Sequence, residues 1–200
     1  MSSIAIFGGT FNPIHNGHIN FAEHIKNELK IDKIIIVPTK IPPHKSAANL
    51  ESDNDRLNMC RLAIDGHDGF EVSDYEISRG DISYTINTLN HFKELFPKDK
   101  LYFIMGSDMF LSLQTWKKFE EILSLSTIIT ASREDGDLKK IQAQVEKFRQ
   151  YNAEIVILSF KPYEISSTEV RNLIKFGRNY HCYLPKKIVQ YISEKKLYLK

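Results

Sequence analysis

The stretch that decides the fold runs from Ile4 to His18 and reads IAIFGGTFNPIHNGH. The run Ile4 to Phe7 is apolar, which predicts a buried strand near the start of the chain. Two glycines, at positions 8 and 9, follow it directly, and a helical pattern begins near Gly17. Glycines let a backbone approach a ligand closely, while the first turn of a helix offers unpaired N–H groups and a partial positive charge. The stretch therefore predicts a turn that binds phosphate groups.

Two common nucleotide-binding motifs do not describe this turn. The Walker A motif needs Gly-Lys-Ser or Gly-Lys-Thr, and the dinucleotide-binding motif needs the spacing G-x-G-x-x-G. Neither pattern occurs between Ile4 and His18. Both of those nucleotide sites are therefore excluded at this position.

Short apolar runs alternate with amphipathic stretches along the chain, which is the order of a parallel sheet flanked by helices. Strands are predicted at Ile4–Phe7, Lys33–Val37, Phe70–Val72, Lys100–Met105, Ser126–Ala131 and Glu154–Ser159. Apolar residues at helical spacing predict helices over 19–29, 57–64, 86–96 and 138–151. A capping box from Ser166 to Glu169 and a proline at 185 predict two more helices, which form a small helical C-terminal part. The fold class is therefore α/β, and the 200 residues are expected to form a single domain.

Composition narrows the classes of function. The formal net charge is only +2 and the lysines are scattered, which argues against a partner nucleic acid. Cys60 and Cys182 have no C-x-x-C spacing, so neither a zinc site nor a disulfide framework is indicated and a cytoplasmic setting is expected. The start of the chain resembles a strand rather than a signal peptide, and the apolar runs are too short to cross a membrane. The sequence is compatible with a homo-oligomer.

His15 and His18 lie three positions apart at the predicted start of the first helix, where both imidazoles can face one anion. A neighbouring phosphate raises the pKa of a histidine, and an imidazolium can stabilise charge that grows during phosphoryl-group transfer. The alternatives are a metal pair, two solvent-facing histidines or two core histidines. A zinc site of the H-E-x-x-H type is missing, and the glycine turn beside the pair favours the phosphate role.

A second cluster of hydrogen-bond donors lies near the C-terminus. Ser166, Ser167 and Thr168 open a predicted helix, and Arg171 follows one turn later. A triphosphate could be held between this helix end and the first one. The alternative is an ordinary capping box with a surface arginine.

Three further positions carry both a binding and a structural interpretation. Gly106 and Asp108 follow a predicted strand at the sheet edge where ligands bind in α/β folds, although Asp108 could equally cap a helix. Trp116, the only tryptophan, could stack on a pyridinium ring or belong to the core. Lys45, in a proline-rich loop, could contact a phosphate or remain solvated.

The segment G-G-T-F-x-P-x-H-x-G-H resembles the motif of the nucleotidyltransferase superfamily and, in particular, of bacterial nicotinate-mononucleotide adenylyltransferases. Further matches span nearly the whole chain. They are Pro42-Pro43-His44-Lys45, Arg79-Gly80 with Ser83-Tyr84-Thr85 and Thr88-Leu89, Gly106-Ser107-Asp108 with Trp116, and Ile165-Ser166-Ser167-Thr168 with Arg171. The last of these elements is shared with other adenylyltransferases, whereas the Ser-Tyr-Thr element and the tryptophan indicate the nicotinate-mononucleotide branch.

The resemblance implies a Rossmann-like nucleotidyltransferase fold and the transfer of AMP from ATP to nicotinic acid mononucleotide. The products would be nicotinic acid adenine dinucleotide and pyrophosphate, in a step of NAD biosynthesis. Mg²⁺ is expected to arrive with ATP, and no metal site made by the protein alone is expected. The implied catalytic residues are His15, His18 and Arg171. The implied ATP-binding residues are Gly8, Gly9, Thr10, Phe11, His15, His18, Gly106, Asp108, Ser166, Ser167, Thr168 and Arg171. The implied acceptor-binding residues are Asn12, Lys45, Tyr84, Thr85 and Trp116.

Two positions depart from the family pattern. Relatives commonly carry aspartate where this chain has Asn12, which puts metal or acceptor contacts at that point in question. The usual Arg-Pro-Gly after the fifth strand is replaced by Arg133-Glu134-Asp135-Gly136, so a differently shaped loop is expected.

Three other functions stay open or are set aside. An adenylyltransferase could use nicotinamide mononucleotide or phosphopantetheine as its acceptor. A nucleotide-sensing module would bind ATP or NAD without turnover, although the retained His15, His18, Lys45 and Arg171 argue against it. A tRNA-synthetase fragment, suggested by the H-x-G-H spelling, lacks the K-M-S-K-S partner motif and the necessary length.

Overall fold

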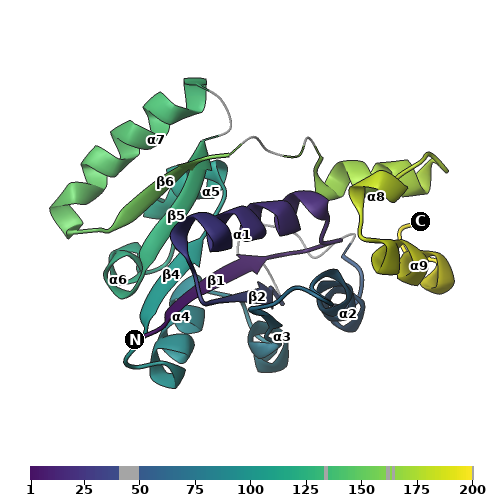
Figure 1. The fold of residues 1–200 in the computed structure, drawn as a ribbon, viewed down its shortest axis with the longest axis horizontal. Helices are drawn as coiled ribbons and strands as arrows, with labels where there is room; N and C mark the ends of the chain where they lie inside the picture. The colour runs from purple at the N-terminus through teal and green to yellow at the C-terminus, as the bar shows by residue number, and fades with distance from the viewer. Residues whose placement is uncertain (41–49, 133–134, 161–162, 164, 200) are drawn as a thin grey trace.

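The computed structural model describes residues 1–40, 50–132, 135–160, 163 and 165–199 (Figure 1). Six strands form one sheet in the order β3-β2-β1-β4-β5-β6, and every neighbouring pair is parallel. The strands are β1 (Ser3–Gly9), β2 (Lys33–Pro38), β3 (Phe70–Val72), β4 (Lys100–Ile104), β5 (Thr127–Ser132) and β6 (Ile155–Ser159). All six predicted strands are confirmed, and the parallel sheet expected of an α/β protein is confirmed with them.

Helices connect the strands and follow the last one. They are α1 (Asn16–Leu29), α2 (Asp53–Ala63), α3 (Tyr75–Arg79), α4 (Thr85–Leu95), α5 (Ser107–Ser112), α6 (Phe119–Leu125), α7 (Asp135–Phe148), α8 (Ser167–Lys175) and α9 (Lys186–Lys195). Three short 3₁₀ helices are η1 (Leu113–Thr115), η2 (Arg149–Tyr151) and η3 (His181–Tyr183). The six predicted helices are confirmed. The sequence did not predict α3, α5 and α6, because helices of 5 to 7 residues are too short to display a helical period.

Both faces of the sheet are buried, which explains why the strands are nearly all apolar. Alternate residues of β1 point to opposite faces. Ala5 and Phe7 join a core cluster with residues of α1, α2, α8 and α9, whereas Ile4 and Ile6 join a second cluster with residues of α4, α5, α6 and α7. Figure 1 shows α1 lying across the sheet, with α9 beside α2 and α8 near α9 at one end, and α7 along β6 at the other. The helical C-terminal part thus shares a core with the first two helices.

The order of the strands reverses at β1, so the chain crosses from β3 back to β4 on the other side of β1. Strands β2 and β3 are added on one side of β1, and strands β4 to β6 on the other. Phe7 of β1 pairs with Ile104 of β4, so the carboxyl ends of these two strands lie next to each other. In open α/β sheets this reversal opens a crevice at the carboxyl ends, where ligands bind. No helix within the described ranges is long and apolar enough to span a bilayer.

Candidate active site

The glycine turn lies at the crevice, because Gly8 and Gly9 are the last residues of β1. A Cβ atom added to Gly9 would lie 2.7 Å from the ring of Phe11, so the packing of the turn itself requires glycine there. A Cβ atom added to Gly8 would meet Cε2 of Phe103 at an ordinary distance of 3.8 Å. Packing within the described residues therefore does not require glycine at position 8. Its missing side chain leaves room for another molecule to approach the backbone.

The two predicted catalytic histidines come together at the start of α1. His15 is the residue that precedes the helix, and His18 is the third residue within it. Their ring centroids are 3.7 Å apart with an interplanar angle of 32°. The backbone N–H of His15 donates to Nδ1 of His18 at 3.2 Å, so a neutral His18 carries its proton on Nε2. The ring of Phe11 packs edge-on against His18, with 5.2 Å between centroids, and helps to fix its orientation.

His15 is neutral in the protein without a ligand. Its side chain is only 6% exposed, and burial lowers its pKa to about 4 although the nearby carboxylate of Glu169 opposes this shift. Its Nδ1 atom has no hydrogen-bond partner among the described residues. The sequence predicts an imidazolium at His15 next to phosphate, which would need a negative charge beyond that of Glu169 to offset the burial.

Phe11 and Asn12, which follow Thr10 in the glycine turn, have buried side chains. The ring of Phe11 is 2% exposed, and its φ of 45° lies in the left-handed region. The side chain of Asn12 is also buried, and its Oδ1 accepts hydrogen bonds from the N–H of Glu51 at 3.1 Å and the hydroxyl of Tyr198 at 3.0 Å. The buried side chains of both residues therefore stabilise the turn from the protein interior. The predicted contacts of Phe11 with ATP and of Asn12 with the acceptor would have to involve mainly their backbones.

The N-terminus of α8 is attached to this turn. The hydroxyl of Ser167 donates to the carbonyl of Pro13 at 2.9 Å. Nη1 of Arg171 donates to the carbonyl of Asn12 at 2.8 Å, and its Nη2 donates to Oγ1 of Thr168 at 3.2 Å. Two helix N-termini that are 151 positions apart in the sequence, at Asn16 and Ser167, thus lie side by side. This is the arrangement predicted for holding a triphosphate.

The capping box predicted at Ser166 is confirmed. The hydroxyl of Ser166 accepts a hydrogen bond from the N–H of Glu169 at 3.2 Å, and Oε2 of Glu169 accepts the N–H of Ser166 at 2.7 Å. Ser166 and Ser167 therefore use their hydroxyls to hold the helix end in place. The first N–H groups of a helix have no partner within it, so these groups and Arg171 are the donors expected to meet an anion.

Gly106 and Asp108 lie across the crevice from the glycine turn. Gly106 follows the end of β4 and is the residue that caps α5, without a side-chain hydrogen bond. Asp108 lies in the first turn of α5, and its side chain is exposed. The alternative interpretation of Asp108 as the helix cap is therefore wrong. Its side chain is accessible to solvent, and the role in ATP binding stays a prediction.

The predicted acceptor-binding residues come from two neighbouring elements. Tyr84 precedes α4 and Thr85 is its first residue, whereas Trp116 follows η1. Trp116 is half-buried and packs edge-on against Phe103 with 6.3 Å between ring centroids. Nζ of Lys117 lies 4.1 Å from the centroid of the Tyr84 ring, which places the two elements against each other. Trp116 is thus neither fully in the core nor fully exposed, as a stacking residue should be.

Two predicted segments lie outside the described residues. They are Pro42-Pro43-His44-Lys45, within 41–49, and Arg133-Glu134.

Sequence patterns did not single out Arg56, which supports the turn from α2. Arg56 is fully buried; its Nη1 donates to the carbonyl of Thr10 at 2.8 Å and its Nη2 lies 2.6 Å from Oδ1 of Asp53. The hydrogen bond from Arg56 to the Thr10 carbonyl holds Thr10 in place in the turn. One signal was present in the sequence: Arg56 occupies the apolar face of α2, three and seven positions before Met59 and Ala63. An arginine on a buried face indicates an internal partner.

The chain resembles known proteins over nearly its whole length. The family model of cytidylyltransferase-like proteins matches residues 6–173. A probable nicotinate-nucleotide adenylyltransferase of Caldicellulosiruptor saccharolyticus is 40% identical over 196 residues, which cover 98% of each chain. A probable nicotinate-nucleotide adenylyltransferase of Clostridium tetani is 37% identical over 199 residues, with 99% of this chain and 100% of that protein covered.

The fold resembles that of solved structures as well. The nicotinic acid mononucleotide adenylyltransferase of Plasmodium falciparum, complexed with NaAD, superposes with a TM-score of 0.78 at 24% identity, covering 99% of this chain and 98% of that one. The parallel sheet, its crevice and the H-x-G-H turn define a nucleotidyltransferase of the cytidylyltransferase-like class. Within that class, the chain belongs to the family of nicotinate-nucleotide adenylyltransferases.

Proposed function

We propose that this protein transfers AMP from ATP to nicotinic acid mononucleotide, giving nicotinic acid adenine dinucleotide and pyrophosphate. The observation that carries the proposal is the junction of the two helix N-termini, where Ser167 holds Pro13 and Arg171 holds Asn12. This junction offers a triphosphate two sets of helical N–H groups, one guanidinium and two imidazoles. The family relatives supply the identity of the acceptor.

The reaction is a direct in-line displacement at the α-phosphorus of ATP. An oxygen of the acceptor's phosphate forms a new bond to the α-phosphorus, while the bond from that phosphorus to the bridging oxygen breaks and pyrophosphate leaves with the electron pair. The acceptor's phosphate is already ionised at neutral pH, so little remains for a general base to remove. The protein contributes alignment of the two substrates and neutralisation of charge.

The residues of the junction divide this work between them. His18 has an Nε2–H that can donate to the triphosphate, and its orientation is fixed by the N–H of His15. His15 acquires a proton when the phosphates offset its burial, and then adds a positive charge beside them. Arg171 is held at the same place by the carbonyl of Asn12. We assign to these three residues the stabilisation of the charge that develops on the transferring group and on pyrophosphate.

Mg²⁺ would enter with ATP. Residues 1–40, 50–132, 135–160, 163 and 165–199 contain no group of three histidine, cysteine, aspartate or glutamate side chains that could hold a metal ion. Because Mg²⁺ keeps several waters and binds readily to nucleotide phosphates, the ion does not need a cage of protein ligands. Its role would be to neutralise charge on the phosphates.

The acceptor end of the site favours a carboxylate over an amide. The first turn of α4, which begins at Thr85, contains no acidic residue, so its N-terminal N–H groups and dipole favour an anion. Lys117 adds a positive charge beside Tyr84. A nicotinamide group would present N–H donors to these donors and leave some of them unpaired. We therefore propose that the acid form of the mononucleotide is the preferred acceptor.

The test is a comparison of acceptors. Purified protein is incubated with ATP, Mg²⁺ and, separately, nicotinic acid mononucleotide, nicotinamide mononucleotide and phosphopantetheine, and the product is identified by mass spectrometry. We expect nicotinic acid adenine dinucleotide and an equal amount of pyrophosphate, with a higher kcat/KM than for either other acceptor. A higher kcat/KM for another acceptor would overturn the assignment, and the absence of product with all three would favour a nucleotide-sensing module.

A further inference from the structure

A buried carboxylate lies next to the acceptor-binding residues without being one of them. Glu76, on α3, is 6% exposed. Its Oε1 accepts a hydrogen bond from Oγ1 of Thr88 at 2.5 Å, and its Oε2 has no hydrogen-bond partner among the described residues. Burial raises the pKa of Glu76, and the hydroxyls of Thr88 and Ser83 and the charge of Arg79 oppose that shift. A carboxyl group in such surroundings costs stability relative to an apolar side chain, so its presence is not explained as a stabilising feature.

The contacts of Glu76 converge on the turn that presents Tyr84 and Thr85. Thr88 is 2% exposed and lies in the first turn of α4, three positions after Thr85. Ser83, the residue before Tyr84, is also buried and faces the Glu76 carboxyl, whose pKa its hydroxyl lowers. The two neighbours of Glu76 therefore bracket the two predicted acceptor-binding residues in the sequence.

The same turn is attached to the strand on the other side. Oγ of Ser83 accepts a hydrogen bond from the backbone N–H of Lys40 at 2.9 Å, just after the end of β2. With its oxygen engaged by Lys40, the hydroxyl of Ser83 can direct its own proton towards Glu76. Glu76, Ser83 and Lys40 thus form a link from α3 through the turn to the carboxyl edge of the sheet.

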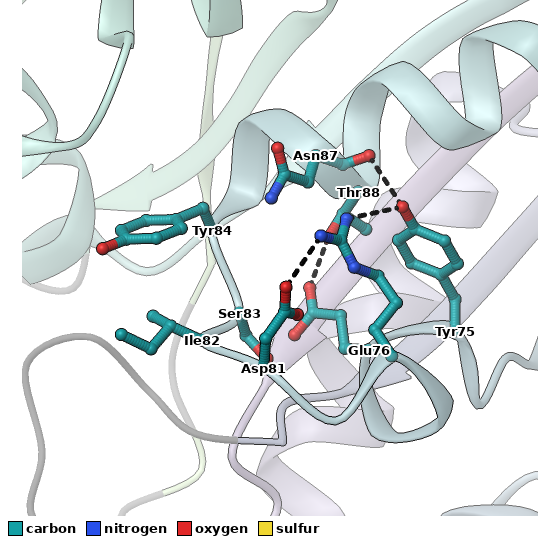
Figure 2. Close-up of a pocket in the computed structure, with 9 residues that line it drawn as sticks. Tyr75, Glu76, Asp81, Ile82, Ser83, Tyr84, Asn87 and Thr88 are labelled. Carbon is teal, nitrogen blue, oxygen red and sulfur yellow. Dashed lines mark hydrogen bonds and ion pairs between the residues drawn. The ribbon is translucent and has the colours of Figure 1, made fainter.

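The side chains of this turn point in two directions. Figure 2 shows Tyr84 and Ile82 directed to one side, whereas Glu76 and Tyr75 lie on the other. The pocket between these side chains, which Tyr84 lines together with Glu76 and Thr88, opens to solvent and holds about 160 Å³, which is too little for a mononucleotide. The outward side carries the ring of Tyr84 with Lys117 over it. A change at Glu76 would therefore reach the acceptor only through the position of the turn.

We propose that Glu76 is a positioning residue for the acceptor, which fixes the turn carrying Tyr84 and Thr85 through Thr88 and Ser83. This inference rests on the proposed function, because it assigns the turn to the binding of the mononucleotide. Loss of the Glu76 contacts would let the start of α4 move relative to Trp116, so the acceptor's ring would be held less well. The two helix N-termini that meet the triphosphate do not include this turn, so ATP binding would be preserved.

The experiment measures the KM for each of the two substrates separately. Steady-state kinetics are measured for Glu76→Ala, Glu76→Gln and Thr88→Val, with ATP and nicotinic acid mononucleotide varied in turn. We expect Glu76→Ala and Thr88→Val each to raise the KM for the mononucleotide about tenfold and to leave the KM for ATP within about twofold of wild type. Glu76→Gln keeps an oxygen that accepts from Thr88, so its KM should stay within about threefold of wild type.

The double variant Glu76→Ala/Thr88→Val provides the control for coupling. Because both changes remove the same hydrogen bond, its KM for the mononucleotide should not exceed that of the worse single variant by more than about twofold. If Glu76→Ala does not fold, the nearly isosteric Thr88→Val still gives the result. Equal rises in both KM values, or a lower melting temperature with both KM values unchanged, would overturn the role of Glu76. Failure of the proposed function is a different outcome, in which wild-type protein itself forms no dinucleotide.

Discussion

The hydroxyl of Tyr198 donates a hydrogen bond of 3.0 Å to Oδ1 of Asn12, which lies 186 positions earlier in the chain. Tyr198 is 7% exposed, and its backbone N–H donates to Oε1 of Glu51 at 2.8 Å. Asn12 in turn presents its carbonyl to Arg171. The end of the chain therefore supports the position of an arginine that we place at the triphosphate, although nothing in the sequence around Tyr198 indicates a functional role.

Tyr198→Phe should weaken ATP binding and stability together. The change leaves Asn12 with one donor fewer in a buried position, which costs about 1 kcal/mol of the free energy of unfolding. A looser Asn12 carbonyl would hold Arg171 less well, so we expect a rise of about threefold to tenfold in the KM for ATP. Urea unfolding and steady-state kinetics measure the two effects.

Tyr191→Phe is the matched control for this variant. Tyr191 donates to Oδ1 of Asp55 at 2.8 Å rather than to Asn12, so the loss of its hydroxyl should cost stability and leave the KM for ATP unchanged. The same KM change in both variants would contradict the link from Tyr198 to Arg171.

Gly9→Ala should lower the stability of the protein, whereas Gly8→Ala should weaken the binding of ATP. At position 9 the added Cβ would lie 2.7 Å from the Phe11 ring, so the variant should lose about 1–3 kcal/mol of stability. At position 8 the nearest atom beyond its chain neighbours, Cε2 of Phe103, is 3.8 Å away, so the melting temperature should hardly change. If ATP passes over Gly8, its KM should nevertheless rise at least tenfold. A Gly8→Ala protein with normal kinetics would move the phosphates away from this backbone.

His15 should make the free protein less stable in mild acid. Its pKa is about 4 when folded and 6.5 in its ordinary state, so between these pH values the unfolded chain binds the extra proton. The free energy of unfolding therefore rises with pH between pH 4 and pH 6.5. The stability that the neutral His15 contributes is fully present above pH 6.5 and is lost as the pH falls towards 4. The loss amounts to at most about 3 kcal/mol. We expect urea unfolding at pH 7 and 4.5 to show a larger loss for wild type than for His15→Asn. Parallel losses would contradict a neutral, buried His15.

Lys117 should set the preference for the acid over the amide. Lys117→Met removes the positive charge beside Tyr84, so we expect the ratio of kcat/KM for nicotinic acid mononucleotide to that for nicotinamide mononucleotide to fall about tenfold. Lys118→Met is a matched control, because Nζ of Lys118 lies 2.9 Å from Oε1 of Glu121 on the surface. An unchanged ratio for Lys117→Met would leave the helix N-terminus as the source of the preference.

The sequence predicted what depends on local pattern. Strands such as β1 and β2 were predictable because buried parallel strands are continuous apolar runs. The start of α8 was predictable because its capping box involves only Ser166 and Glu169. The family motif gave His15, His18 and Arg171, and the structure adds what brings them together.

The supporting contacts were not predictable in this way. Arg56, Glu76 and Tyr198 bond to partners 46, 12 and 186 positions away, and apart from the place of Arg56 on a buried helix face nothing in their own segments indicates these contacts. Only the fold decides which buried group a distant side chain reaches. The same reason explains Asn12, whose side chain the family motif suggests for the acceptor and the fold uses for Glu51 and Tyr198.

His18→Ala should remove most of the activity without unfolding the protein. His18 is half-buried at the surface of α1, and its Nε2–H is the donor that we place against the triphosphate. Loss of one donor to a developing negative charge typically lowers kcat by about 10²–10³-fold.

His24→Ala, on the same helix, is the control: His24 packs against Phe160 with 5.1 Å between ring centroids, so kcat should stay within about twofold of wild type. The binding of ATP, measured by calorimetry, should weaken far less in His18→Ala than kcat falls, because the contact strengthens as charge develops. A fully active His18→Ala protein would remove this residue from the mechanism, and equal losses in binding and in kcat would reduce its role to holding ATP.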